Sequence, residues 1–208
     1  MKKGIIISFE GIDGCGKTTQ AKLFEKYLRE EGKGTIYLYE PGCTEIGEKI
    51  RKLLLSTGRN VDIWTELFLY FSSRAQLIAE KIKNAKSDGK IVVLDRYIYS
   101  TLAYQGYGRG IPLQLINSIH RYFVDGYFPD LTFIIDVKAE DIMSLLNKKK
   151  KDRIEKESIQ FQKKVRQGYL KIAKNNKNIK VVKRKTVEET HREIVEIWEN
   201  FKNEYRGY

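Results

Sequence analysis

The chain has 208 residues, of which 41% are hydrophobic, enough for one compact domain with a full core but too few for two. No apolar stretch approaches the roughly 20 residues of a membrane-spanning helix and no segment resembles a cleavable leader, so we expect a soluble, cytosolic protein. Two cysteines exclude a disulfide framework and lack the spacing of a metal site, so Cys15 and Cys43 are predicted to fill space.

The formal net charge of +12 would by itself favour a nucleic acid as partner, but its distribution argues against one. Residues 143–185 hold 16 Lys or Arg against 3 Asp or Glu, so the remainder of the chain is close to neutral. A basic segment of this kind forms either a solvated helical face or a lid that closes over phosphates. The pattern alone does not separate these two interpretations.

The segment GIDGCGKTT at residues 11–19 matches G-x-x-x-x-G-K-[ST], the motif of a phosphate-binding P-loop. A β-branched and aromatic run precedes it at 4–10 and a helical pattern follows at 20–28, in the order that the motif requires. This agreement disfavours the alternative of a chance glycine-rich turn. We therefore predict that Lys17 contacts the β- and γ-phosphates of a nucleotide and that Thr18 binds Mg²⁺. The predicted phosphate-binding residues are Gly11, Asp13, Gly14, Cys15, Gly16, Lys17, Thr18 and Thr19.

Beyond this motif, apolar strand patterns alternate with helical patterns. Further strands are expected at 35–39, 91–94, 131–137 and 179–182. Helices are expected at 46–54, 63–86, 113–124, 139–146, 154–174 and 188–205. No hairpin signal separates the strands, so these patterns predict βαβ units. We expect a three-layer α/β P-loop fold, a single domain over residues 1–208, with a mostly parallel central sheet of about five strands between helices.

Ionisable residues follow several of the predicted strands, and ligands of such sheets bind beyond the carboxyl ends of the strands. Glu40, Asp95, Arg96 and Asp136 stand at these positions. Phosphoryl transfer needs cations that neutralise the charge of the moving group, so Lys17 and Arg96 are predicted to be catalytic. Asp95 is the expected carboxylate for Mg²⁺, and a salt bridge with Arg96 or a helix N-cap is the alternative.

Several motifs along the chain together resemble thymidylate kinases of the bacterial and archaeal type. They are FEGIDGCGKTT at 9–19, EPG at 40–42, IRKLLL at 50–55, ELFLYFSSR at 66–74, DRYIYSTLAYQG at 95–106, PDLT at 129–132 and DRIE at 152–155. The pattern D-R-Y-x-x-S-x-x-A-Y-Q-G is the most specific, and the resemblance extends nearly from end to end. It implies transfer of the γ-phosphate of ATP to dTMP on a nucleoside monophosphate kinase fold, with Mg²⁺ as cofactor and a homodimer as the assembly.

The resemblance also implies which residues bind the thymine base. The implied contacts come from Tyr70, Arg74, Thr101 and Gln105, with Ser100 supporting the same pocket. Tyr70 and Arg74 lie one helical turn apart, so a ring and a guanidinium share one helix face and can hold a planar base. For Tyr70 the alternative is plain core packing, and for Ser100 and Gln105 it is the formation of a turn.

The rest of dTMP is implied to contact charged side chains and one tyrosine. Arg51 and Arg96 correspond to the arginines on the phosphate, and Tyr104 to a residue beside the deoxyribose. Asp13 corresponds to a catalytic carboxylate near the sugar hydroxyl and Mg²⁺. Arg51 as a solvated helix residue and Tyr104 as a packing aromatic are the alternatives. The EPG loop adds Glu40 and Pro41 to the lining of the acceptor site.

Gly14 stands where some thymidylate kinases carry a catalytic arginine within the P-loop, whereas other members supply this cation from a lid. The resemblance therefore implies that the lid, expected at about 143–158, supplies it here. Arg153 is the first choice for this catalytic cation, with Lys148–Lys151 beside it.

Four features depart from the usual pattern of the family. Tyr39 replaces an arginine before the EPG loop, Cys43 replaces a second glycine after it, Tyr70 adds a hydroxyl to the usual Phe, and the segment 181–185 is more basic than usual near adenine. Two rival functions stay open. One is a kinase for another nucleoside monophosphate or for a deoxynucleoside, and the other is a P-loop ATPase that binds nucleic acid in a strongly salt-dependent manner.

Overall fold

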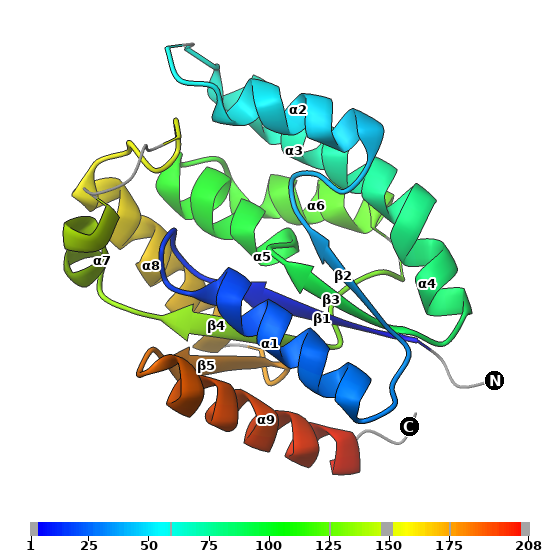
Figure 1. Cartoon of the computed structure of the whole chain (residues 1–208). Helices are drawn as coiled ribbons and strands as arrows, with labels where there is room; N and C mark the ends of the chain where they lie inside the picture. The colour runs from blue at the N-terminus through cyan, green and yellow to red at the C-terminus, as the bar shows by residue number, and fades with distance from the viewer. Residues whose placement is uncertain (1–3, 59, 125, 147–151, 175, 205–208) are drawn as a thin grey trace.

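The computed structural model describes residues 4–58, 60–124, 126–146, 152–174 and 176–204. Its centre is a five-stranded sheet in the order β2-β3-β1-β4-β5, in which every neighbouring pair is parallel (Figure 1). The strands are Ile5–Glu10 (β1), Thr35–Tyr39 (β2), Ile91–Asp95 (β3), Leu131–Asp136 (β4) and Ile179–Lys183 (β5). The predicted α/β architecture with five strands is confirmed.

The central strands are buried along their whole length, which is why their sequences are nearly continuous apolar runs. Inside these strands, away from their acidic ends, Ser8 of β1 and Thr132 of β4 are polar, and their hydroxyl groups hydrogen-bond each other at 2.8 Å across the two strands. Two buried polar groups thus satisfy one another inside the sheet.

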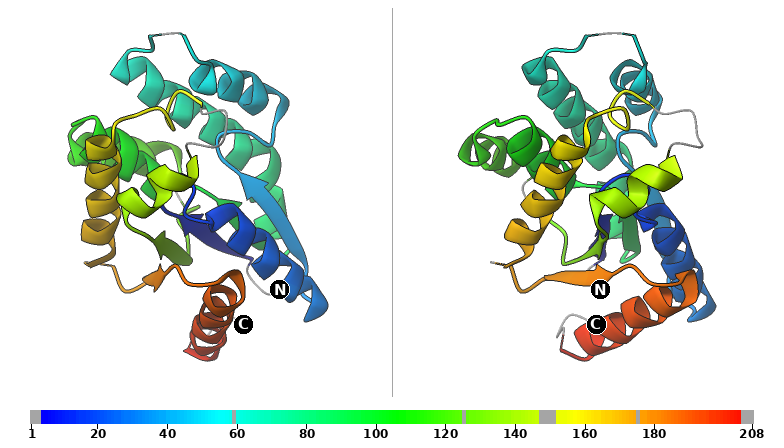
Figure 2. Two further views of the ribbon diagram at one scale, coloured as in Figure 1. Left: turned by 60° about the vertical axis from the view of Figure 1, so that its left-hand side comes forward. Right: turned by 90° about the vertical axis from the view of Figure 1, so that its left-hand side faces the viewer.

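Helices pack on both faces of the sheet (Figures 1 and 2). The helices of the described residues are α1 (Lys17–Glu30), α2 (Glu45–Leu55), α3 (Ile63–Leu77), α4 (Lys83–Ser87), α5 (Ile98–Thr101), α6 (Leu113–Phe123), α7 (Ala139–Leu146), α8 (Ile159–Lys174) and α9 (Val187–Glu204), with π-helical segments η1 (Ile78–Ile82) and η2 (Leu102–Gly108). On one face, Phe24 of α1 and Trp198 of α9 form an aromatic cluster with Phe9 and Phe133 of the sheet. On the opposite face, α5 and α8 lie at the carboxyl end of β1, where Ser100 and Tyr169 hydrogen-bond Glu10.

Two predicted helices differ from the structure. The helix expected at 63–86 contains the π-helical segment η1, which side-chain spacing does not distinguish from the α-helix around it. The helix expected at 154–174 begins only at Ile159. The Asp152 carboxylate accepts hydrogen bonds from the backbone N–H groups of Ile154 and Glu155, both at 2.9 Å, and so folds these residues into a turn. Of the predicted lid, Lys148–Lys151 lie outside the described residues.

The parallel arrangement brings the P-loop, Glu40 and the Asp95–Arg96 pair to one edge of the sheet, as predicted from the strand ends. Asp136 also follows a strand, but its carboxylate accepts two hydrogen bonds from Arg166 of α8, at 2.6 and 2.8 Å, and it does not line the cleft described below. No helix among the described residues has an apolar run long enough to cross a bilayer.

Candidate active site

A cleft of about 480 Å³ lies at the carboxyl edge of the sheet. The P-loop, the β2–α2 loop, α3, the segment from β3 to η2 and the turn after residue 151 form its walls. The predicted site residues that line it are Asp13, Gly14, Lys17, Thr18, Glu40, Pro41, Arg51, Tyr70, Asp95, Arg96, Ser100, Thr101, Tyr104 and Gln105. The predicted residues outside this lining are Gly11, Cys15, Gly16, Thr19, Arg74 and Arg153.

The P-loop adopts a backbone conformation that favours its glycines. Gly11 has a φ of 141°, and a β-carbon there would lie 2.7 Å from the carbonyl oxygen of Ile135. Gly16, with a φ of 97°, is the N-cap of α1, and the described residues give this helix neither a side-chain cap nor an acid in its first turn. The start of α1 therefore offers backbone N–H groups and partial positive charge to an anion such as a phosphate.

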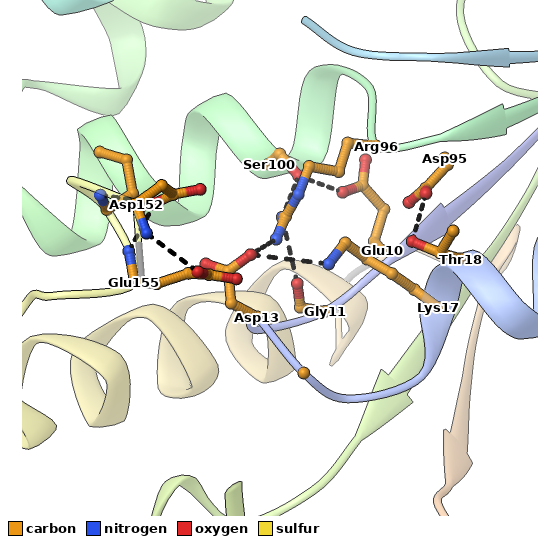
Figure 3. A network of polar contacts seen from close by, with 12 residues as sticks. Glu10, Gly11, Asp13, Lys17, Thr18, Asp95, Arg96, Ser100, Asp152 and Glu155 are labelled. Carbon is orange, nitrogen blue, oxygen red and sulfur yellow. Dashed lines mark hydrogen bonds and ion pairs between the residues drawn. The ribbon is translucent and has the colours of Figure 1, made fainter. Parts of the chain in front are cut away.

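Asp13 lies between two cations at the mouth of this loop (Figure 3). Its carboxylate pairs with the Arg96 guanidinium and with Lys17 Nζ at 3.7 Å, and it accepts a hydrogen bond from Tyr104 Oη at 2.8 Å. Burial pushes the pKa of Asp13 upward, but Arg96, Lys17 and these hydrogen bonds outweigh burial and lower the pKa to about 2. Asp13 is therefore ionised throughout the neutral range.

Arg96 is held in one orientation although its backbone has a φ of 70°, which is uncommon outside glycine. Its N–H donates to the carbonyl of Phe9 at 2.9 Å, and its Nη1 donates to the carbonyl of Gly11 at 3.2 Å and to Ser100 Oγ at 3.1 Å. The surrounding structure thus fixes both the strained backbone and the guanidinium. A cation held in this way needs little reorganisation to stabilise phosphate charge.

Glu10 is a member of this network that the sequence analysis did not identify. It is fully buried and accepts hydrogen bonds from Ser100 Oγ at 2.6 Å and from the backbone N–H of Tyr97 at 3.0 Å. Burial raises the pKa of Glu10, against the opposing effect of these hydrogen bonds and of Arg96. An ionisable residue at the end of a wholly buried strand is the signal that could have revealed it.

Asp95 and Thr18 form an oxygen-rich corner beside the P-loop. Thr18 Oγ1 donates to Asp95 Oδ2 at 2.5 Å, and Tyr37 Oη reaches the same oxygen at 3.3 Å. Asp95 Oδ1 is buried and has no hydrogen-bond partner within the described chain. Hard oxygen donors suit Mg²⁺, which commonly binds one or two protein groups together with phosphates and waters. The residues present therefore fit this metal.

The far end of the cleft presents polar groups from α3, α5 and η2. Thr101 is 1% exposed, and its buried Oγ1 has no hydrogen-bond partner among the described residues. Gln105 is similarly buried and donates from Nε2 to Glu66 at 2.8 Å. Tyr70 lines the same part of the cleft, and burial raises the pKa of its phenol. This compartment can bind a planar group with a polar edge.

The model of the family described as thymidylate kinase matches residues 9–194 of the chain. The chain belongs to the thymidylate kinase family. The thymidylate kinase of Thermoanaerobacter sp. (strain X514) is 48% identical over 172 residues, covering 83% of this chain and 85% of the relative. The thymidylate kinase of Fervidobacterium nodosum is 44% identical over 195 residues, covering 93% and 98%. The crystal structure of thymidylate kinase from Ehrlichia chaffeensis matches with a TM-score of 0.80 at 34% identity, covering 94% of this chain and 99% of that one.

Arg74 does not reach the cleft, although the resemblance to thymidylate kinases implies that it holds the base. Its guanidinium is 2% exposed and donates to both carboxylate oxygens of Glu40, to the carbonyl of Tyr97 and to His120 Nε2. These contacts occupy Nε and both terminal nitrogens, so Arg74 fixes the Glu40–Pro41 turn from behind. Its direct contact with a base stays a prediction that this placement does not support.

Arg153 is likewise turned away from the P-loop. Its Nη2 donates to Glu66 at 2.6 Å and its Nε to the carbonyl of Leu54 at 2.9 Å. Figure 2 shows the segment that carries it, in yellow, beside α2. The role of Arg153 as the lid cation of a thymidylate kinase therefore requires it to move, and it stays a prediction.

The contact between Arg74 and His120 predicts a dependence of stability on pH. His120 is fully buried, packs on Phe71, and its pKa falls from 6.5 to about 2 because of burial first and the Arg74 charge second. Below about pH 6.5 the His120 imidazole becomes protonated in the unfolded chain but stays neutral in the folded chain. The free energy of unfolding should therefore fall by about 2 kcal/mol between about pH 7 and about pH 5 from this group alone.

Urea titrations of wild type and His120→Gln across this pH range test this prediction. The variant should lose the part of the fall in unfolding free energy that His120 causes. If the free energy of unfolding falls equally with pH in both proteins, His120 is not its cause.

Tyr39, one of the four departures expected from the resemblance, contacts both Glu48 and Arg51. Its hydroxyl donates to Glu48 at 2.6 Å, and this hydrogen bond is the largest cause of the lowered pKa of Glu48. The Arg51 guanidinium lies 5.3 Å from the centre of the Tyr39 ring and donates to the carbonyl of Pro41 at 2.8 Å. The ring and the Pro41 carbonyl thus direct Arg51 along the wall of the cleft.

Tyr39→Phe removes this hydroxyl and keeps the ring. The ring under Arg51 then loses its hydrogen bond to Glu48, worth about 1 kcal/mol, and holds Arg51 less firmly, so the KM for dTMP should rise about fivefold with little change in kcat. Steady-state kinetics measure both constants. Tyr27→Phe, which loses a hydroxyl contact to Glu199 between α1 and α9, is the matched control. A fall in kcat at constant KM would contradict this role for Tyr39.

Proposed function

We propose that the protein transfers the γ-phosphate of MgATP to the phosphate of dTMP, giving dTDP and ADP for dTTP synthesis. The observation that carries this proposal is one cleft lined at the P-loop end by Lys17 and, from α5 and η2, by Thr101 and Gln105. Arg96 links the two ends through its contacts with Asp13 and Ser100. Donor phosphates at the P-loop and a base at the far end would thus place the acceptor phosphate beside Arg96.

Phosphoryl transfer depends mainly on the positions of the two substrates and on positive charge around the transferred group. Lys17 and Arg96 would neutralise the charge that spreads over the oxygens of the transferred group. The acceptor phosphate is already ionised at neutral pH, so the reaction needs no general base. Thr18 and Asp95 would hold Mg²⁺, which when bound neutralises phosphate charge. Closure of the cleft would exclude water, which otherwise hydrolyses ATP without forming dTDP.

Product identification tests the reaction type. Incubation with γ-labelled ATP and dTMP should give labelled dTDP in step with ADP release, and removal of Mg²⁺ should abolish the transfer. Labelled inorganic phosphate as the main product, with or without dTMP, would show an ATPase and contradict the proposal.

Arg153 remains our candidate for the lid cation, because it lies in sequence between Asp152 and Ile154, which both line the cleft. Arg153→Ala should lower kcat about 100-fold or more, with a much smaller effect on the KM for dTMP. Lys156→Ala, an exposed change in the same turn, is the control and should leave kcat unchanged. If Arg153→Ala keeps the wild-type kcat, Arg153 is not the lid cation.

We also infer that the protein acts as a homodimer in the cytoplasm. The support for the dimer is an exposed apolar surface on α3, where Trp64 and Phe68, one helical turn apart, are 42% and 55% exposed in the single chain. Covering them with a second copy would bury this surface. Sedimentation at micromolar concentration should give twice the mass of one chain, and Phe68→Glu should give monomers. A monomeric wild type would contradict the inference.

A further inference from the structure

Glu66, in the first turn of α3, accepts hydrogen bonds from three residues of two separate segments, η2 with its C-cap and the turn after residue 151. It is 1% exposed, and Oε1 accepts from Gln105 Nε2 at 2.8 Å and from Arg109 Nε at 3.1 Å. Oε2 accepts from Arg109 Nη2 at 3.2 Å and from Arg153 Nη2 at 2.6 Å. A buried carboxylate is costly to keep charged unless at least one cation stays paired with it, and here three residues give it four hydrogen bonds.

The carboxylate determines how the amide of Gln105 is oriented. Burial pushes the pKa of Glu66 upward, but hydrogen bonds from Arg109, Gln105 and Arg153 outweigh it and lower the pKa. An ionised carboxylate only accepts hydrogen bonds, so the NH₂ group of Gln105 must face Glu66. The amide oxygen of Gln105, on the other branch of the amide, is then the atom that can accept a hydrogen bond from a base in the cleft, which Gln105 lines. This orientation suits a base that presents a ring N–H, and it disfavours one that presents a bare ring nitrogen.

The ion pairs of Arg109 and Arg153 also indicate which of these two arginines can separate from Glu66. Arg109 has a second carboxylate, because its Nη1 pairs with Glu157 at 2.6 Å, and it stacks 4.6 Å from the centre of the Phe161 ring. Among the described residues, Arg153 donates to Glu66 and to the carbonyl groups of Leu54 and Leu55. Departure of Arg153 would leave Glu66 still paired with Arg109. The cluster therefore tolerates the loss of Arg153 and not the loss of Arg109.

We propose that Glu66 is a positioning residue. It orients Gln105 toward the acceptor base, and it binds Arg153 beside the cleft until Arg153 moves to the phosphates. The proposal rests on the proposed function and deepens it, because it assigns the choice of a pyrimidine with a ring N–H to a residue that does not touch the base. Glu66 acts on the acceptor through Gln105 and on the phosphates through Arg153.

Glu66→Gln tests the first of these actions. The new amide can donate as well as accept, so Gln105 is free to turn over and present its NH₂ group to the cleft. The ratio of kcat/KM for dTMP to kcat/KM for dCMP should then fall about tenfold or more, the equivalent of one misplaced hydrogen bond of about 1.4 kcal/mol. Glu80→Gln, an exposed change further along the same helical region, should leave the ratio unchanged.

A double-mutant cycle separates positioning from plain structural support. If Glu66 acts through Gln105, Gln105→Ala should lower the ratio, and adding Glu66→Gln to it should cause no further loss. Additive losses in the double variant would overturn the proposal. So would an unchanged ratio in Glu66→Gln.

A second variant keeps the test valid if Glu66→Gln does not fold. Glu66→Asp keeps the charge and withdraws it by one methylene group, so the ratio should fall in the same direction by a smaller factor, and a ratio equal to that of wild type would contradict the proposal. The two failures are distinguishable. A wild type that does not prefer dTMP refutes the proposed function, whereas a wild type that prefers dTMP with an unchanged ratio in the variants refutes only the role of Glu66.

Discussion

Lys17→Ala should lower kcat by about 10²- to 10³-fold, the usual effect of removing a preorganised charge that stabilises a transition state. Lys17 begins α1 at the floor of the cleft, next to Asp13. Its removal leaves Asp13 paired with Arg96, so the fold should survive with little change in the midpoint of thermal unfolding.

Steady-state kinetics together with a melting curve measure both effects. Lys26→Ala is the matched control, because Lys26 lies on the same helix and forms an exposed pair with Glu30 that contributes little. Retention of wild-type kcat in Lys17→Ala would show that the P-loop does not bind the transferred phosphate and would contradict the mechanism.

Arg74→Met should lower the free energy of unfolding by about 3–5 kcal/mol, because it leaves the Glu40 carboxylate buried without its partner. Arg74 and Glu40 are 2% and 3% exposed in their side chains and are joined by three hydrogen bonds. The variant also deprives His120 of its donor. Urea denaturation at neutral pH measures the loss.

Two further variants locate the cause of this loss. Arg29→Met breaks an exposed ion pair with Glu25 and should cost about 1 kcal/mol or less. Adding Glu40→Leu to Arg74→Met removes the unpaired charge and should recover most of the stability. If the double variant is no more stable than Arg74→Met, the loss arises from packing and not from the buried charge.

The fold and the phosphate end of the cleft were predictable because their signals are local. A P-loop needs a strand, glycines and a helix in sequence, and GIDGCGKTT has all of them within a few residues of each other. Parallel strands then place Asp95 and Arg96 at the same edge by topology alone.

The partners of Arg74 and Arg153 were not predictable from such patterns. Glu40 is 34 residues from Arg74, and Glu66 is 87 residues from Arg153. Residue spacing identifies helix faces but does not show which buried carboxylate a distant guanidinium meets. The same limit applies to Glu10, whose role depends on Ser100 and Tyr97 reaching it from another segment.

The specificity for the acceptor nucleotide tests most directly the claim that the protein phosphorylates dTMP. A coupled assay should measure kcat/KM for dTMP, dUMP, dCMP, dGMP and dAMP at saturating MgATP. The value for dTMP should be at least about 100-fold above those for dCMP and dAMP, because cytosine N3 and adenine N1 carry no hydrogen to donate to the Gln105 amide oxygen. Equal activity on dCMP or dAMP would contradict this prediction and would favour a kinase for another nucleoside monophosphate.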